Sequence, residues 1–150
     1  DAAVEAHGPI EILINNAGAI FTKKITTVDG FERTWALNHN AYFLLTSLLK
    51  EQLVATPESR VISTASEAHR PGKMGWHDLQ YEKRGNRNGW SSYCQSKLAN
   101  ILFTKELAKR LEGTSVSMFG NLLANLVKKG ISVLKFPFRP KMVLLTGSTP

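Results

Sequence analysis

Hydrophobic positions along this chain follow two patterns: short apolar runs, and longer segments in which apolar residues recur every three or four positions. The short runs predict strands covered on both faces, and the longer segments predict amphipathic helices. Strands alternating with helices indicate an α/β fold with a parallel sheet and right-handed crossovers. The expected elements are a helix end at 1–7, a strand at 11–15, a helix at 29–54, a strand at 60–64, a polar loop at 67–89, a helix at 90–111, a strand at 114–119 and a helix at 121–136, before an irregular tail.

Polar residues mark the ends of two predicted strands. The first strand leads into Asn15-Asn16-Ala17-Gly18, and the strand at 60–64 is soon followed by Ser66. Ligands bind beyond the carboxyl ends of strands in open α/β sheets, so these residues are candidates for a site. Each also has a plain structural explanation, because amides and glycine form turns and a serine caps the segment after it.

One polar residue interrupts the apolar face of the helix expected at 29–54. Asn38 shares the three-and-four spacing of Trp35, Tyr42 and Leu49, so its amide is expected to be buried. A buried amide needs hydrogen-bond partners. Asn38 is therefore either a core asparagine with protein partners or a residue that holds a water in a site.

Tyr93 and Lys97 stand four residues apart in the helix expected at 90–111, so their side chains share a face. An ammonium close to a phenol lowers the pKa of the phenol, which can then give a proton to a carbonyl or take one from an alcohol. This is half of a redox reaction, and the hydride of a cofactor would supply the other half. The plain alternative is a lysine that snorkels beside a half-buried tyrosine.

The composition is that of a globular domain with a basic balance. Hydrophobic residues make up 43% of the chain, the net charge is +7, and no acid follows Glu112. The basic residues indicate a solvated surface, or attraction to anionic lipid heads or cofactor phosphates. Cys94 is the single cysteine, which fits a reducing compartment and a small core residue. The four histidines lack the spacing of a tetrahedral metal site, so we expect no metal, and no nucleic-acid motif is present.

Taken together, Asn15-Asn16-Ala17-Gly18, Asn38, Ser66 and Tyr93-x-x-x-Lys97 occur in the order found in the short-chain dehydrogenases/reductases, a family that the chain resembles. Residues 77–84 and 93–111 are similar to the retinol dehydrogenase-like branch. The resemblance implies a partial Rossmann-like fold, a doubly wound parallel sheet with flanking helices.

The family pattern also implies roles for individual residues. Tyr93 would be the general acid/base, and Lys97 would lower its pKa and hold the nicotinamide ribose. Ser66 would orient the substrate oxygen, and Asn38 would hold a water that links Lys97 to solvent. The residues implied to border the cofactor are Asn15, Ala17, Gly18, Tyr93 and Lys97.

Two family motifs are missing from this sequence. There is no Gly-rich turn for the cofactor pyrophosphate, and no Pro-Gly loop after the strand expected at 114–119. We expect residues 1–119 to be the central and catalytic part of a Rossmann-like dehydrogenase domain. Residues 120–150 are expected to be a rearranged substrate-side helix with an irregular basic tail. The N-terminal part of the domain, which would choose NAD or NADP, is expected to be absent.

The function implied is that of an NAD(P)-dependent oxidoreductase, which transfers a hydride between NAD(H) or NADP(H) and an alcohol or carbonyl. The implied substrate is small and lipophilic, such as a retinoid, a steroid or another apolar aldehyde or ketone. Two other hypotheses stay open. One is a truncated, non-catalytic remnant that keeps only the dimerisation helices, and the other is a basic module at a membrane surface.

The resemblance further implies a homodimer formed through the two long helices, and no nucleic-acid partner. No apolar run reaches the length of a membrane helix. The expected location is therefore cytoplasmic, or membrane-associated if a lost N-terminus carried an anchor.

Overall fold

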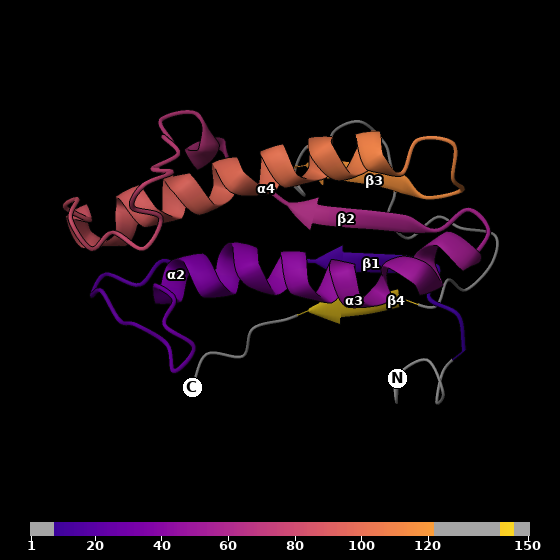
Figure 1. Cartoon of the computed structure of the whole chain (residues 1–150), viewed down its shortest axis with the longest axis horizontal. Coiled ribbons are helices and arrows are strands. Elements are labelled where there is room, and N and C mark those ends of the chain that lie inside the picture. The colour runs from indigo at the N-terminus through magenta and orange to yellow at the C-terminus, as the bar shows by residue number, and fades with distance from the viewer. Residues whose placement is uncertain (1–7, 122–141, 146–150) are drawn as a thin grey trace.

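Four parallel strands form one sheet in the computed structural model, which describes residues 8–121 and 142–145 (Figure 1). The sheet order is β3-β2-β1-β4. The strands are β1 Ile12–Asn15, β2 Arg60–Thr64, β3 Ser117–Asn121 and β4 Met142–Leu145. The predicted parallel α/β architecture is confirmed.

The first long helix begins at Arg33 and runs to Ala55 in three joined parts. These are α2 Arg33–Trp35, a π-helical turn η1 Ala36–Asn40, and α3 Ala41–Ala55. The predicted start at residue 29 was too early, because Gly30 has a positive φ of 82° and closes a turn with Thr27. The carboxylate of Glu32 then caps the helix by accepting hydrogen bonds from two backbone N–H groups of its first turn.

The second long helix, α4 Trp90–Arg110, matches its prediction closely. Gly89 precedes it with a φ of 74°, and a side chain at this position would collide with the Phe21 carbonyl. The side chain of Asn86 accepts a hydrogen bond from Ser92 N at 3.1 Å. This geometry sets where α4 begins, and so places Tyr93 in its first turn.

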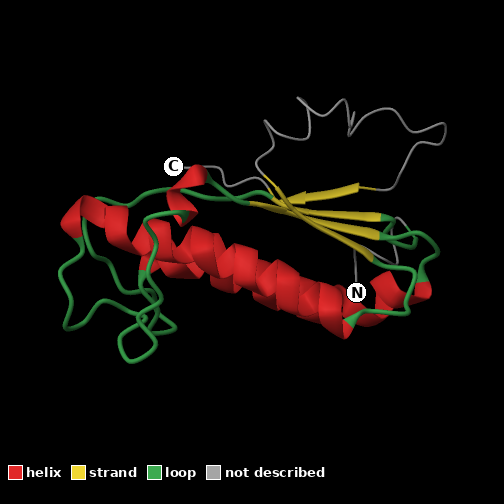
Figure 2. Cartoon of the chain, turned by 90° about the horizontal axis from the view of Figure 1, so that it is seen from above, coloured by secondary structure: helices red, strands yellow, loops and turns green. Residues whose placement is uncertain are grey.

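Helices α3 and α4 lie on the same face of the sheet (Figure 2). The chain steps from β1 to β2 and from β2 to β3 in one direction, so right-handed crossovers place both helices on one side. Leu13 and Val61 pack against Leu49 and Leu53 of α3 between these layers. On the other side of the strands, Ile12, Ile14 and Ile62 form a second buried cluster.

The carboxyl-terminal region differs from its prediction. The third strand begins at Ser117 rather than at 114, because Thr114 closes a turn back to Leu111. Residues 142–145, expected to belong to an irregular tail, form strand β4 beside β1. The helix end expected at 1–7 and all but the first residue of the helix expected at 121–136 lie outside the described residues.

Candidate active site

The site is built where β1 and β2 end, against the first turns of α4. Asn15 closes β1 and pairs in register with Ser63 of β2. The side chain of Thr64, the last residue of β2, donates a hydrogen bond to Asn16 Oδ1 at 2.9 Å. The two polar strand ends therefore meet at one edge of the sheet, as expected for parallel strands.

Tyr93 and Lys97 lie together, as their spacing predicts. The Lys97 Nζ atom is 5.7 Å from the centre of the Tyr93 ring and donates a hydrogen bond to the Thr64 carbonyl at 3.2 Å. Lys97 is 3% exposed, so it is a buried ammonium rather than a snorkelling one. Burial lowers its pKa from 10.5 to about 8. Trp90 stacks on Tyr93 with ring centres 5.8 Å apart.

Asn38 is fully buried, and its amide is held by protein groups on every side. Its Nδ2 donates to Ala19 O at 3.0 Å and to Ser96 Oγ at 3.1 Å, while its Oδ1 accepts from Ala19 N at 2.9 Å. The side chain therefore fastens the loop after β1 to α4. The π-helical turn around Asn38 is a feature often found at functional sites. A water-holding role for Asn38 stays a prediction.

The loop after β1 reaches over Lys97. A side chain built on Gly18 would come within 3.3 Å of both Lys97 Nζ and Asn38 Oδ1, so glycine allows the backbone to approach these two groups. Asn15 is buried and donates to Thr46 Oγ1 at 3.0 Å. Ala17 is buried, whereas Gly18 is exposed. Of the residues expected to border a cofactor, Gly18 is the one that faces solvent on this loop.

Ser66 caps the short helix η2, Glu67–His69, by accepting a hydrogen bond from Ala68 N at 3.2 Å. This is the plain structural use that a serine after a strand predicts. A hydroxyl has one donor and two acceptor lone pairs, so the O–H of Ser66 can still donate to a substrate oxygen. η2, which Ser66 caps, contacts α4, the helix that carries Tyr93.

Four residues of this region were not predicted as site residues. Ser96 accepts from Asn38, and Asn100 Nδ2 donates to the Asn38 backbone carbonyl at 2.8 Å. Buried Gln95 binds the loop at 67–89 through Gly75 N, the Arg84 guanidinium and Leu79 O. Tyr42 lies 5.9 Å from Lys97, measured from its ring centre. The four-residue step from Asn38 is the sequence signal that could have indicated Tyr42.

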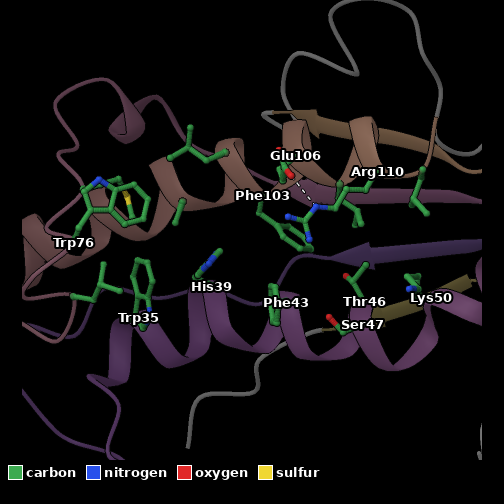
Figure 3. A pocket seen from close by; sticks show the side chains of 16 residues that line it. Trp35, His39, Phe43, Thr46, Ser47, Lys50, Trp76, Phe103, Glu106 and Arg110 are labelled. Atoms are coloured by element: carbon green, nitrogen blue, oxygen red, sulfur yellow. Dashed lines mark hydrogen bonds and ion pairs between the residues drawn. The ribbon is translucent and has the colours of Figure 1, made fainter.

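A separate groove of about 600 Å³ runs between α3 and α4. Figure 3 shows Trp35, His39, Phe43 and Phe103 pointing into it from the two helices, with the Glu106–Arg110 ion pair at its rim. Burial lowers the pKa of His39, although a hydrogen bond to Asn100 opposes the shift. None of the predicted site residues lines this groove.

Two negative observations apply to residues 8–121 and 142–145. No three His, Cys, Asp or Glu side chains gather there in a way that could hold a metal ion. No helix within these ranges is long and apolar enough to cross a membrane.

Comparison with known proteins identifies a family model described as short chain dehydrogenase, which matches residues 1–122. Human retinol dehydrogenase 12 is 51% identical over 110 residues, which are 73% of this chain and 34% of that protein. An uncharacterized protein from Mycobacterium Paratuberculosis has a similar structure, with a TM-score of 0.68 and 40% identity over 77% of this chain and 42% of its own. A short chain dehydrogenase from Burkholderia cenocepacia J2315, solved in complex with NADP, gives a TM-score of 0.56 and 26% identity over the same shares.

This chain thus spans about a third, 34%, of the length of human retinol dehydrogenase 12. The matched part contains β1, the two long helices, β2 and β3. It includes Asn38, Ser66, Tyr93 and Lys97.

Proposed function

Because the chain belongs to the short-chain dehydrogenase family, we propose that it carries the proton-transfer site of an oxidoreductase. The reaction is the interconversion of an alcohol and a carbonyl, and a bound NAD(H) or NADP(H) supplies or accepts the hydride. The observation that carries the proposal is the buried Lys97 ammonium beside the Tyr93 ring. A structural lysine would gain more by keeping its charge in water.

Tyr93 is the proton-transfer group of this proposal. Its hydroxyl gives a proton to the carbonyl oxygen during reduction and takes one from the alcohol during oxidation. Lys97 lies beside the Tyr93 ring and would hold the nicotinamide ribose. The O–H of Ser66 donates a hydrogen bond to the same substrate oxygen and orients it.

The strand order supports a nucleotide site beside β1. β2 and β3 lie on one side of β1, while β4 pairs with it on the other, where Asn15 and Leu145 are in register. Open α/β sheets bind ligands beyond the carboxyl ends of the strands where the strand order reverses. Asn15, Ala17 and Gly18 would border a cofactor there, and a chain ending at Lys141 should lose cofactor binding because it lacks β4.

A lipophilic substrate is the finer part of the proposal. It is supported by the similarity to a protein named retinol dehydrogenase 12. A retinoid-like aldehyde such as all-trans-retinal is therefore the first substrate to test, followed by a panel of apolar ketones and steroids.

The proposed partner is a second copy of the chain, packed on the outer face of α3 and α4. This face carries exposed apolar side chains, among them Phe43 at 54%, Leu44 at 59% and Leu48 at 66% exposed. Lys50 and Arg110 lie with Glu106 at the groove, so two copies could pair charges of opposite sign. Exposed apolar surface of this kind is typical of association sites. The proposed location is the cytoplasm, or a membrane with which the protein is associated.

The decisive experiment compares turnover by the parent chain with that of Tyr93→Phe. All-trans-retinal reduction with NADPH or NADH is followed by loss of cofactor absorbance. Tyr93→Phe is expected to lower kcat by about 10³-fold, the range of a general acid or base, and Tyr81→Phe is the matched control. Equal turnover in parent and Tyr93→Phe would refute the role of Tyr93, and no turnover by a folded parent would favour a non-catalytic remnant.

A further inference from the structure

Tyr42 is a fully buried residue of α3 whose hydroxyl has no hydrogen-bond partner among the described residues. Buried polar atoms in native proteins almost always have a partner, and ordered water serves where no protein group does. A core position needs only the ring, since phenylalanine would fill the same space without a polar atom. The hydroxyl therefore requires an explanation of its own.

The surroundings of Tyr42 connect it with Lys97. The Lys97 Nζ atom lies over both aromatic rings, 5.9 Å from the Tyr42 ring centre and 5.7 Å from the Tyr93 ring centre. Burial raises the pKa of Tyr42, and the charge of an ionised Tyr93 raises it further. Tyr42 thus stays protonated and keeps both a donor and acceptor lone pairs.

The ammonium of Lys97 has hydrogen-bonding capacity left. It has three N–H donors, and the Thr64 carbonyl is the partner that the structure describes. The Asn38 amide is already bound to Ala19 and Ser96.

In the part of the chain that the structure describes, the titratable groups found beside Lys97 are Tyr42 from α3 and Tyr93 from its own helix. Within residues 8–121 and 142–145, the ion pairs found do not include Lys97. Its protonation therefore depends on neutral hydrogen-bond partners rather than on a carboxylate.

We propose that Tyr42 is a positioning residue for Lys97, acting through a bound water that accepts a hydrogen bond from the ammonium and donates one to the Tyr42 oxygen. This water fixes the ammonium beside Tyr93 and stabilises its charged form. The arrangement of Lys97, the water and Tyr42 involves no residue outside this chain and does not depend on the proposed function. Its effect on catalysis rests on the proposed function.

The primary test measures the titration of Lys97 by NMR in protein labelled with [ε-¹³C]lysine, with the signal assigned from Lys97→Met. Tyr42→Phe keeps the ring and removes only the hydroxyl. It is expected to lower the pKa of Lys97 by about half a unit or more, because the charged form loses a hydrogen bond. Tyr81→Phe is the control, since Tyr81 is also buried but its hydroxyl donates to Ser91 O at 2.8 Å.

An unchanged Lys97 titration in folded Tyr42→Phe would overturn the proposal, and so would an equal shift in Tyr81→Phe. A second readout is a double-mutant cycle on the melting temperature. Tyr42→Phe is expected to shift the melting temperature of the parent but not that of Lys97→Met. Equal shifts in both backgrounds would show that Tyr42 acts independently of Lys97 and would overturn the proposal as well.

Turnover gives a third readout, which separates this proposal from the proposed function. Tyr42→Phe is expected to lower kcat about tenfold with KM unchanged, and to move the pH dependence of kcat in the direction of the Lys97 shift. An unaltered kcat and pH profile would overturn the catalytic consequence. Failure of the chain to bind a cofactor would refute the proposed function, yet the lysine titration would still decide the role of Tyr42.

Discussion

Helix α4 presents two faces that reverse the usual rule for a surface helix. On its inner face Ser96, Lys97 and Asn100 are at most 3% exposed, and each has a hydrogen-bond partner. On its outer face Leu102 is 40% exposed, and Phe103 lines the groove shared with α3. Ordinary amphipathic helices bury apolar residues and expose polar ones.

This reversal indicates that the two faces of α4 have different roles. A buried ammonium is costly, because its charge loses the solvation of water, so stability alone does not explain the inner face. Exposed apolar side chains are also unfavourable unless another surface covers them. We therefore propose that the inner face serves the chemistry and the outer face serves association, and changes to one face should leave the other property intact.

Lys97→Met tests the inner face and should have the largest effect. Loss of the ammonium is expected to lower kcat by about 10³-fold. At pH 7 the free energy of unfolding should change by less than about 1 kcal/mol, because a lost hydrogen bond is offset by removal of a buried charge. Turnover and urea denaturation measure the two quantities. Strong destabilisation with little loss of kcat would mean that Lys97 is a structural residue.

Asn38→Ala tests the hydrogen bonds that fasten the π-helical turn η1 and the loop after β1 to this face. It removes the bonds to Ala19 and Ser96 and leaves buried partners unsatisfied, which is expected to cost about 2–4 kcal/mol of unfolding free energy. Urea denaturation provides the value, and half-buried Asn40 in the same turn offers Asn40→Ala as the control. Equal effects of the two substitutions would contradict the special position of Asn38.

The fold was largely predictable, and the exceptions have local causes. The strand at 60–64 was identified from a short run that ends in hydroxyl residues, and the helix at 90–111 from a long segment whose residues repeat at helical spacing. Because of the turn at Gly30, the first helix begins at a later residue than predicted, and because of the turn after Leu111, β3 does too. Strand β4 could not be foreseen, because a short apolar run gains its structure from pairing with β1, far away in the sequence.

The site was predictable only where spacing along one helix decides geometry. Tyr93 and Lys97 are neighbours because they share a helical turn. The contacts of Asn38 with Ala19 and Ser96 join three separate segments, and no local pattern shows such a meeting. Tyr42 looked like a core aromatic, since its sequence position reveals burial but not that its hydroxyl lacks a partner.

The pH dependence of stability offers a smaller test of the inner face. The folded pKa of Lys97, about 8, lies below its ordinary value of 10.5. Between these pKa values the unfolded chain binds a proton that the folded chain does not. The contribution of Lys97 to the free energy of unfolding therefore rises with pH. The difference in unfolding free energy between parent and Lys97→Met should increase by up to ~1.4 kcal/mol per pH unit in this window. A flat difference would contradict a buried ammonium.

Leu48→Glu tests the outer face and should have the smallest effect on the isolated chain. A charge on this exposed side chain is expected to weaken self-association at least about tenfold, or ~1.4 kcal/mol, with kcat per chain unchanged. Analytical ultracentrifugation measures the association, and fully exposed Val28 provides the control Val28→Glu. Unchanged association in Leu48→Glu would argue against α3 as the dimer surface.

Isothermal titration calorimetry can measure whether NADH and NADPH bind to the purified 150-residue chain. This measurement tests whether the chain carries a cofactor site. Saturable binding of at least one of the two is expected, because the loop through Gly18 and the buried Lys97 would border the cofactor. A folded sample that binds neither would contradict this expectation, and the polar inner face of α4 would then be an inherited arrangement that this chain does not use.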